Sequence, residues 1–103
     1  MLTHGHPDQV GGLTDAAGNL NYPNAQYYMT KTEWEFWNNA PIPKGQELNF
    51  PVACKTLPVI KKRVTRIDYG QEILPGITVL AASGHTPGHL GLIIASGSET
   101  LLH

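Results

Sequence analysis

Two histidine clusters, one near the start of the chain and one far downstream, constrain this sequence most. The first reads Thr3-His4-Gly5-His6-Pro7-Asp8-Gln9 and the second Gly84-His85-Thr86-Pro87-Gly88-His89, and together they hold four of the five histidines. Imidazole and carboxylate groups are common ligands of zinc and other transition metals. The glycines and prolines between them allow tight turns, which let such side chains converge. We therefore expect the two clusters to meet in the folded chain and to form a metal site.

The first cluster places three ligand-type side chains at alternate positions, namely His4, His6 and Asp8. In an extended or turning backbone, alternate side chains project to the same side. All three are therefore candidate metal ligands. A plain surface loop is the alternative interpretation of such a histidine pair, and the second cluster is the reason for preferring the metal site.

In the second cluster, Pro87 and Gly88 exclude a regular helix between His85 and His89. The two histidines are therefore expected on a loop between two strands. His89 directly precedes an apolar run that would anchor it, so we predict it as the metal ligand of this loop. His85 is expected beside the metal or in a substrate pocket, and a turn histidine hydrogen-bonded to backbone is its alternative interpretation.

Two helices are predicted, at residues 30–38 and 53–63. Thr30 and Glu33 have the spacing of a capping box at the start of the first helix. Asparagines and Pro41 end that helix, and a proline-rich irregular connection follows at residues 40–52. The aromatic residues of the first helix are interpreted as core or interface packing: Trp34, Phe36 and Trp37.

Strands are predicted where apolar residues alternate or run together. The continuous apolar run at residues 90–95 is typical of a fully buried strand. Pro75-Gly76 and the residues from Ser96 to Glu99 are expected to form turns. The other predicted strands are at residues 25–29, 64–67, 72–74, 77–82 and from 100 onward. This order of elements predicts one α/β (α+β) domain over residues 1–103, with one mixed β-sheet and two or three flanking helices.

Composition excludes several classes of function. The net charge of −1 offers no basic surface for nucleic acid or an anionic membrane, and the longest apolar run is too short to span a bilayer. We therefore expect no nucleic-acid and no membrane partner. Cys54 is the single cysteine, so an intrachain disulfide is excluded and a cytoplasmic location is expected. Four cations gather near the end of the second predicted helix and are interpreted as a solvated surface rather than a phosphate site: Lys61, Lys62, Arg63 and Arg66.

The two clusters also resemble known signatures. Thr-His-Gly-His-Pro-Asp-Gln-Val-Gly-Gly-Leu is similar to the His-x-His-x-Asp-His motif of the metallo-β-lactamase-fold hydrolases. Gly-His-Thr-Pro-Gly-His-Leu-Gly resembles the later zinc-ligand loop of their lactonase- and glyoxalase II-like members. The resemblance covers the whole chain, and it implies that the chain corresponds to the central part of an αββα metallo-β-lactamase-like sandwich.

The resemblance implies a ligand set and a chemistry. His4, His6 and His89 would hold one zinc ion, and Asp8 would bind a second zinc and is the candidate catalytic residue. Gln9 stands where the family motif has a histidine. Because an amide is a poor zinc ligand, one zinc site is expected rather than two, and Gln9 is placed beside the metal or in the substrate pocket. The implied substrate is a small molecule with an ester, lactone or thioester bond.

Three functions remain open on the sequence. The favoured one is a truncated metallo-β-lactamase-fold hydrolase that is inactive or impaired, because Gln9 departs from the motif and the chain ends before the family's later ligands. The second is a functional zinc hydrolase with a three-histidine site. The third is a non-catalytic binding protein, whose candidate surface is aromatic: Tyr27, Tyr28, Trp34 and Trp37. For the truncated form, exposed sheet edges predict a homo-oligomer.

Overall fold

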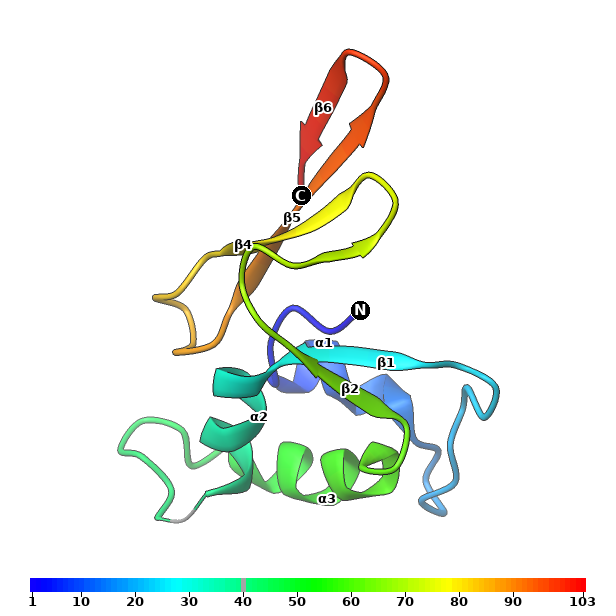
Figure 1. The fold of residues 1–103 in the computed structure, drawn as a ribbon. Coiled ribbons are helices and arrows are strands. Elements are labelled where there is room, and N and C mark those ends of the chain that lie inside the picture. Colours follow the sequence, from blue (N-terminus) through cyan, green and yellow to red (C-terminus); the bar gives the residue numbers. More distant parts are fainter. Residues whose placement is uncertain (40) are drawn as a thin grey trace.

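A computed structural model describes residues 1–39 and 41–103 of the chain. One position of the predicted connection at 40–52, residue 40, therefore lies outside the described residues. The molecule measures 44 × 32 × 20 Å. Figure 1 shows a helical layer beneath a pair of strands, with a second group of strands extending away from it. The fold is mixed α and β, as the sequence predicted.

The first sheet is a parallel pair. β1 (Tyr27–Thr30) lies beside β2 (Val64–Ile67), with Tyr27 opposite Val64 and Thr30 opposite Ile67. Parallel neighbours need a long crossover, and here α2 (Lys31–Asn38) and α3 (Phe50–Ile60) supply it. The short α1 (Pro7–Val10) and the 3₁₀ turn η1 (Gly11–Leu13) precede β1 and pack against α3.

The helix predicted at residues 30–38 is confirmed as α2. Thr30 is its N-cap, and the Thr30 hydroxyl accepts a hydrogen bond from the Glu33 backbone N–H at 3.1 Å. The second predicted helix is confirmed with shifted limits, since α3 begins at Phe50 and ends at Ile60. It begins earlier because Pro51 suits the first turn of a helix, where its missing N–H has no partner to lose.

The second sheet is antiparallel. Its strands are β3 (Glu72–Leu74), β4 (Ile77–Ala81), β5 (Leu90–Ser96) and β6 (Glu99–Leu102), in that spatial order. β4 and β5 pair from Ile77 opposite Ile94 to Ala81 opposite Leu90, and the loop between them carries the second histidine cluster. The predicted strands are therefore present, with ends that differ by at most two residues.

Two details of the sequence prediction were wrong. The strands form two sheets rather than one mixed sheet, because the turn after Ile67 carries the chain away from β1 and β2 before β3 begins. The strand over residues 90–95 is also not fully buried. Only Leu90 and Gly91 are buried, because among the described residues nothing covers the far half of β5.

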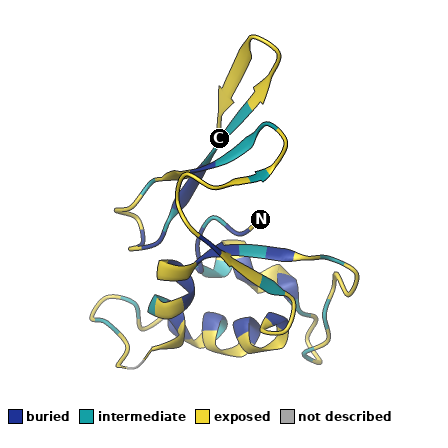
Figure 2. Ribbon diagram, viewed as in Figure 1, coloured by how far each residue is buried: buried dark blue, intermediate teal, exposed yellow. Residues whose placement is uncertain are grey.

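The core is concentrated in the helical layer (Figure 2). Its largest buried cluster joins α1, β1, α2 and α3, and it includes Tyr27, Trp34 and Trp37. The prediction that the α2 tryptophans pack in the core is confirmed. Since Tyr27 is also buried and Tyr28 is half-buried, the four aromatic residues of the third functional hypothesis do not form an exposed surface. A smaller cluster joins the two sheets: Ile67, Val79 and Leu90.

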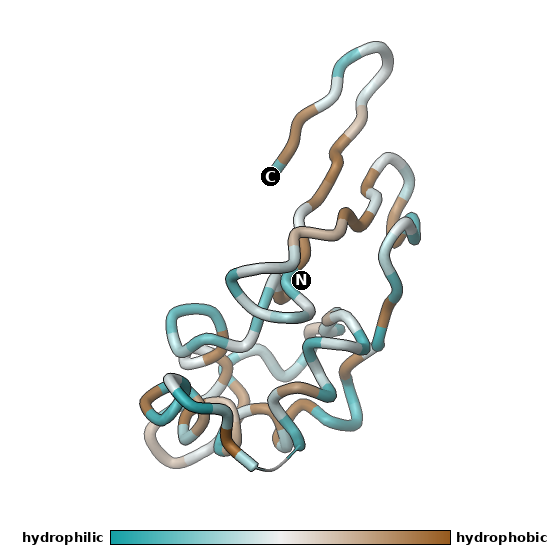
Figure 3. The backbone as a smooth tube through the Cα atoms, turned by 90° about the vertical axis from the view of Figure 1, so that its left-hand side faces the viewer, coloured by the Kyte–Doolittle hydropathy of each residue, from teal (hydrophilic) through white to brown (hydrophobic). Residues whose placement is uncertain are grey.

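The outer strands are apolar and yet exposed. Figure 3 shows apolar segments continuing into the upper hairpins, where Figure 2 shows exposed residues. Leu101 and Leu102 of β6 expose 61% and 66% of their surface. Within the part of the chain that the structure describes, no helix has the length and apolar character needed to cross a membrane.

Candidate metal centre

The two histidine clusters meet, as their composition predicted. His4 and His6 lie on the segment that leads into α1, and His85 and His89 lie on the loop between β4 and β5. The ring centroid of His4 is 4.8 Å from that of His6, 4.7 Å from that of His85 and 4.8 Å from that of His89. His6 and His85 are 4.5 Å apart by the same measure. Four imidazoles therefore share one small volume.

Three of these residues could hold a metal ion. Each of His4, His6 and His85 offers a ring nitrogen within 4.8 Å of the other two. His85, which was expected beside the metal or in a substrate pocket, thus belongs to the compact group. His89 contacts the ring of His4 but is outside this group.

The nitrogen atoms of the group fit a bound cation. His4 Nε2 and His6 Nε2 are buried, and neither has a hydrogen-bond partner. The remaining nitrogen of His4 lies 3.0 Å from the Thr3 hydroxyl, and His6 Nδ1 lies 2.9 Å from His85 Nε2. A buried polar atom without a partner is costly, and a metal ion satisfies such an atom directly. The donor set therefore fits a transition metal that accepts imidazole ligands.

His89 is fixed by the backbone of its own loop. Its Nδ1 lies 3.1 Å from the Ala82 carbonyl oxygen, so Nδ1 carries the proton and donates. A hydrogen bond of this kind sets the ring orientation and makes Nε2 the nitrogen that could bind a metal, which is also how metal-ligating histidines are usually held. The ligand role predicted for His89 stays a prediction.

The cluster favours neutral imidazole at His4. Burial lowers the pKa of His4 below its ordinary value of 6.5, and the nearby His6, His89 and His85 lower it further. Asp8 acts weakly in the opposite direction. Neutral imidazole is the form that binds metals, so the burial of His4 keeps it in the competent state.

Asp8 and Gln9 lie at the exposed rim of the cluster. The Gln9 amide donates to Asp8 Oδ2 at 3.3 Å, and this bond is the main reason that the pKa of the Asp8 carboxyl is lowered. Gln9 Oε1 accepts from the Thr3 hydroxyl at 3.4 Å. The structure does not bring Asp8 into the three-histidine group, and its predicted roles as ligand and catalytic residue stay predictions.

Sequence reasoning missed Glu33 as a residue of the site. It is completely buried on α2, and its carboxylate accepts four hydrogen bonds. Oε1 accepts from the Gly5 backbone N–H at 2.8 Å and from the Trp37 indole. Oε2 accepts from the Thr86 hydroxyl at 2.7 Å and from the Gly88 N–H at 2.9 Å. The only signal in the sequence was an acid on the same face as Trp37, one turn away.

Two glycines allow these close contacts. A Cβ atom on Gly88 would lie 2.1 Å from the Glu33 backbone nitrogen, and one on Gly5 would lie 2.3 Å from the Trp37 indole nitrogen. Neither distance is possible for real atoms without a shift of the neighbour. Both histidine loops can therefore approach α2 only because each has a glycine at its point of contact.

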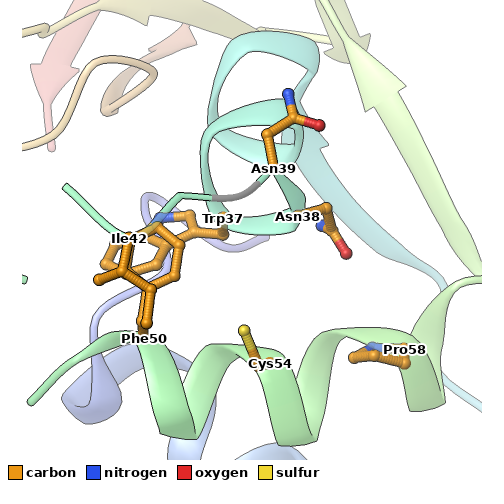
Figure 4. Close-up of a pocket in the computed structure, with 7 residues that line it drawn as sticks. All are labelled: Trp37, Asn38, Asn39, Ile42, Phe50, Cys54 and Pro58. Atoms are coloured by element: carbon orange, nitrogen blue, oxygen red, sulfur yellow. The ribbon is translucent and has the colours of Figure 1, made fainter. Parts of the chain in front are cut away.

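Two cavities flank this region. One, of about 480 Å³, lies beside His4 and His89, and its walls include the apolar Leu80, Leu90 and Leu102. The other, of about 230 Å³, lies between α2 and α3, where Figure 4 shows Trp37, Phe50 and Cys54. Trp37, which lines the second cavity, packs against the ring of Phe50 on one side and contacts the ring of His6. The cavity beside His4 is therefore the one adjacent to the metal-binding group.

Comparison with known proteins agrees with this geometry. The family model described as the metallo-beta-lactamase superfamily matches residues 1–103, and the chain belongs to that superfamily. No curated protein shows significant similarity. One similar solved structure is AidC, a dizinc quorum-quenching lactonase, at 30% identity and a TM-score of 0.86. Others are the hydrolase AbOPH, at 32% identity and 0.79, and a probable metal-dependent hydrolase from Staphylococcus aureus, at 27% and 0.81.

These structures also set the scale of the chain. Each alignment covers 98% of this chain, but the chain covers only 38%, 38% and 35% of AidC, AbOPH and the Staphylococcus aureus protein, respectively. The chain therefore spans little more than a third of the length of these relatives. The expectation that it corresponds to part of a metallo-β-lactamase fold is confirmed at that level.

Proposed function

We propose that this chain carries the histidine site of a metal-dependent hydrolase and binds one zinc ion through His4, His6 and His85. One observation carries the proposal: His4 Nε2 and His6 Nε2 are buried without partners, beside a third imidazole. Three imidazoles are a known zinc ligand set, and such a set leaves a fourth position open. Gln9 supports one ion rather than two, since its amide is a poor zinc ligand.

The chemistry divides between the ion and the chain. Zinc, when bound, supplies Lewis-acid chemistry: it polarises a carbonyl and lowers the pKa of water. The three histidines hold the ion, and the neutral state of His4 keeps its nitrogen available. His89 packs against His4 and restricts its ring. Asp8 and Gln9 stand at the open rim, where a substrate would enter.

The substrate class proposed is an ester, lactone or thioester of a small molecule. The lactonase and hydrolases that the chain is similar to support this class, as does the partly apolar cavity beside His4. We propose that the 103-residue chain binds zinc but hydrolyses such substrates weakly or not at all, because Gln9 removes a second metal ligand. Efficient zinc-dependent turnover of a lactone or thioester by the chain would favour the fully functional alternative.

The experiment compares zinc binding by the wild-type chain, two histidine variants and one control variant, measured by calorimetry. His85→Ala is expected to weaken binding by more than the roughly 10- to 100-fold typical of a lost outer-shell partner. His89→Ala is expected to fall within that range, since His89 supports His4. Glu35→Ala removes a ligand-type side chain at an exposed position of α2, outside the cluster, and is expected to have no effect. No zinc binding by the wild type would contradict the proposal. A larger loss of zinc affinity in His89→Ala than in His85→Ala would favour His89 as the third ligand.

A self-associating chain is the second candidate. The observation that favours it is β6, an edge strand exposed along its whole length, including Leu101 and Leu102. Unpaired edges of this kind pair with other chains.

We also propose a cytoplasmic location, because Cys54 is the single cysteine of the chain and it is free.

A further inference from the structure

We propose that Glu33 is the positioning residue of the metal site: its buried carboxylate joins the two histidine loops and sets the distance between their imidazoles. This inference rests on the proposed metal binding. Glu33 itself touches none of the histidine rings by a hydrogen bond, and it acts through the backbone and through Thr86.

The two oxygens of Glu33 divide between the two loops. Oε1 binds the N–H of Gly5, the residue between His4 and His6. Oε2 binds Thr86 and Gly88, which lie between His85 and His89. A single rigid group thus contacts both clusters at their centres. No other side chain in the described residues hydrogen-bonds to both loops, apart from the direct contact of His6 with His85.

The carboxylate is buried without a cation beside it. The ion pair found among the described residues is Lys31 with Asp68, and both are exposed. Glu33 is instead stabilised by four N–H and O–H donors, and charge-assisted hydrogen bonds of this kind are short and strong. Removing the acceptor would leave these donors buried without partners, so the loops would have to move to satisfy them.

The consequence for the metal site is preorganisation. His4 and His6 reach the site from one loop and His85 from the other, so the geometry of the ligand set depends on how the loops are held together. Metal affinity falls when the groups that orient the ligands are lost, typically by about 10- to 100-fold. Glu33 is the group that orients both loops at once.

The test uses the full chain with Co²⁺ as the probe, read by calorimetry and by visible absorption, which reports the geometry of the ligands. Glu33→Gln keeps the size of the side chain but replaces one oxygen with an NH₂ group. It is expected to weaken Co²⁺ binding by about 10- to 100-fold and to change the spectrum. Glu35→Gln makes the same change at an exposed position of α2 and is expected to match the wild type.

A second pair of variants separates positioning from folding. Thr86→Val removes one donor to Glu33, and Thr56→Val makes the same change at a buried threonine of α3, whose hydroxyl donates to Val52. Both are expected to lower stability, but only Thr86→Val is expected to weaken Co²⁺ binding, by about 10-fold. If Glu33→Gln does not fold, this pair decides the question. Wild-type affinity and spectrum in a folded Glu33→Gln, or equal affinities in the threonine pair, would overturn the proposal.

Failure of the positioning role of Glu33 can be distinguished from failure of the chain to bind a metal ion. If the wild-type chain binds no Co²⁺ and no zinc, the proposed function fails, and the role of Glu33 is read from the metal-free protein by NMR. Glu33→Gln is then expected to speed amide exchange at Gly5 and Gly88 and to remove cross-peaks between the rings of His6 and His85. Unchanged exchange and cross-peaks in a folded Glu33→Gln would overturn the positioning role independently.

Discussion

His4 is the most buried of the clustered histidines, and its environment sets the behaviour of the site at the residue scale. It is surrounded by His6, His85 and His89, with Asp8 as the one nearby acid. Burial and the neighbouring imidazoles favour its neutral form. The metal-free site therefore favours the form of His4 that can bind a cation.

A pH dependence follows for the metal-free protein. The pKa of His4 is lowered on folding, so below its ordinary value of 6.5 the unfolded chain binds more protons than the folded one. Stability is then expected to fall as the pH drops below 6.5 and to level off below the folded pKa. Urea unfolding between about pH 5 and 8, with an NMR titration of the His4 ring, measures both quantities. A His4 titration midpoint above 6.5 would contradict the expectation.

The residues that could be identified from the sequence are those whose meaning is local. His4 and His6 were found because their spacing alone places them together. The choice between His85 and His89 depends on how the Pro87-Gly88 loop curls, which spacing does not specify. Glu33 could not be identified as a bridge, because its partners lie 28, 53 and 55 residues away along the chain.

At the scale of elements, the start of α2 links secondary structure to the site. The capping-box spacing of Thr30 and Glu33 predicted the helix cap correctly but not the partners of the Glu33 side chain. Thr30 caps the helix as predicted, but the Glu33 side chain binds the histidine loops instead of returning to the cap. Thr30 also donates to the Gly88 carbonyl at 2.7 Å, so the cap and the second histidine loop share one hydroxyl.

Thr30→Ala tests this double role. It removes the helix cap and leaves the buried Gly88 carbonyl without its donor, so we expect a loss of about 2 kcal/mol in the free energy of unfolding. Thr30→Ser retains the hydroxyl and should recover most of the loss. Thr32→Ala, at an exposed position of the same helix turn, should stay within about 0.5 kcal/mol of the wild type. Equal losses in Thr30→Ala and Thr32→Ala, measured by denaturant unfolding, would show that the hydroxyl is dispensable.

Sheet membership was the main element-scale property that the sequence left open. Alternation identified the strand at residues 64–67, because it reports which side of a strand faces a core, and β-branched and apolar residues identified the strand at 77–82. It does not report which strand is the neighbour. The separation of β2 from β3 and β4 depends on the turn at Tyr69-Gly70, and a turn signal does not report whether the chain stays in the same sheet.

At the scale of the whole molecule, the helical layer and the antiparallel sheet differ in how well they are covered. The large core lies around the helices, whereas β6 is exposed from Glu99 to Leu102. We expect the 103-residue chain to self-associate through this strand at micromolar concentration, and light scattering measures it. Leu101→Lys should return the chain to a monomer, because a charge on an edge strand opposes pairing. Leu48→Lys changes an equally apolar exposed residue away from the sheets and serves as the control. A wild-type monomer would contradict the expectation.

The close approach of Gly88 to the backbone of Glu33 limits how this site could be transplanted. A designer who copied only the two histidine loops onto another scaffold would take the ligands without the surface against which they are shaped. The smallest portable unit includes the first turn of α2, with its cap and its acid, and it requires a bare Cα at the crossing point. For the same reason, sequence libraries aimed at new metal specificity should vary the rim at Asp8 and Gln9 and leave positions 5, 33 and 88 fixed.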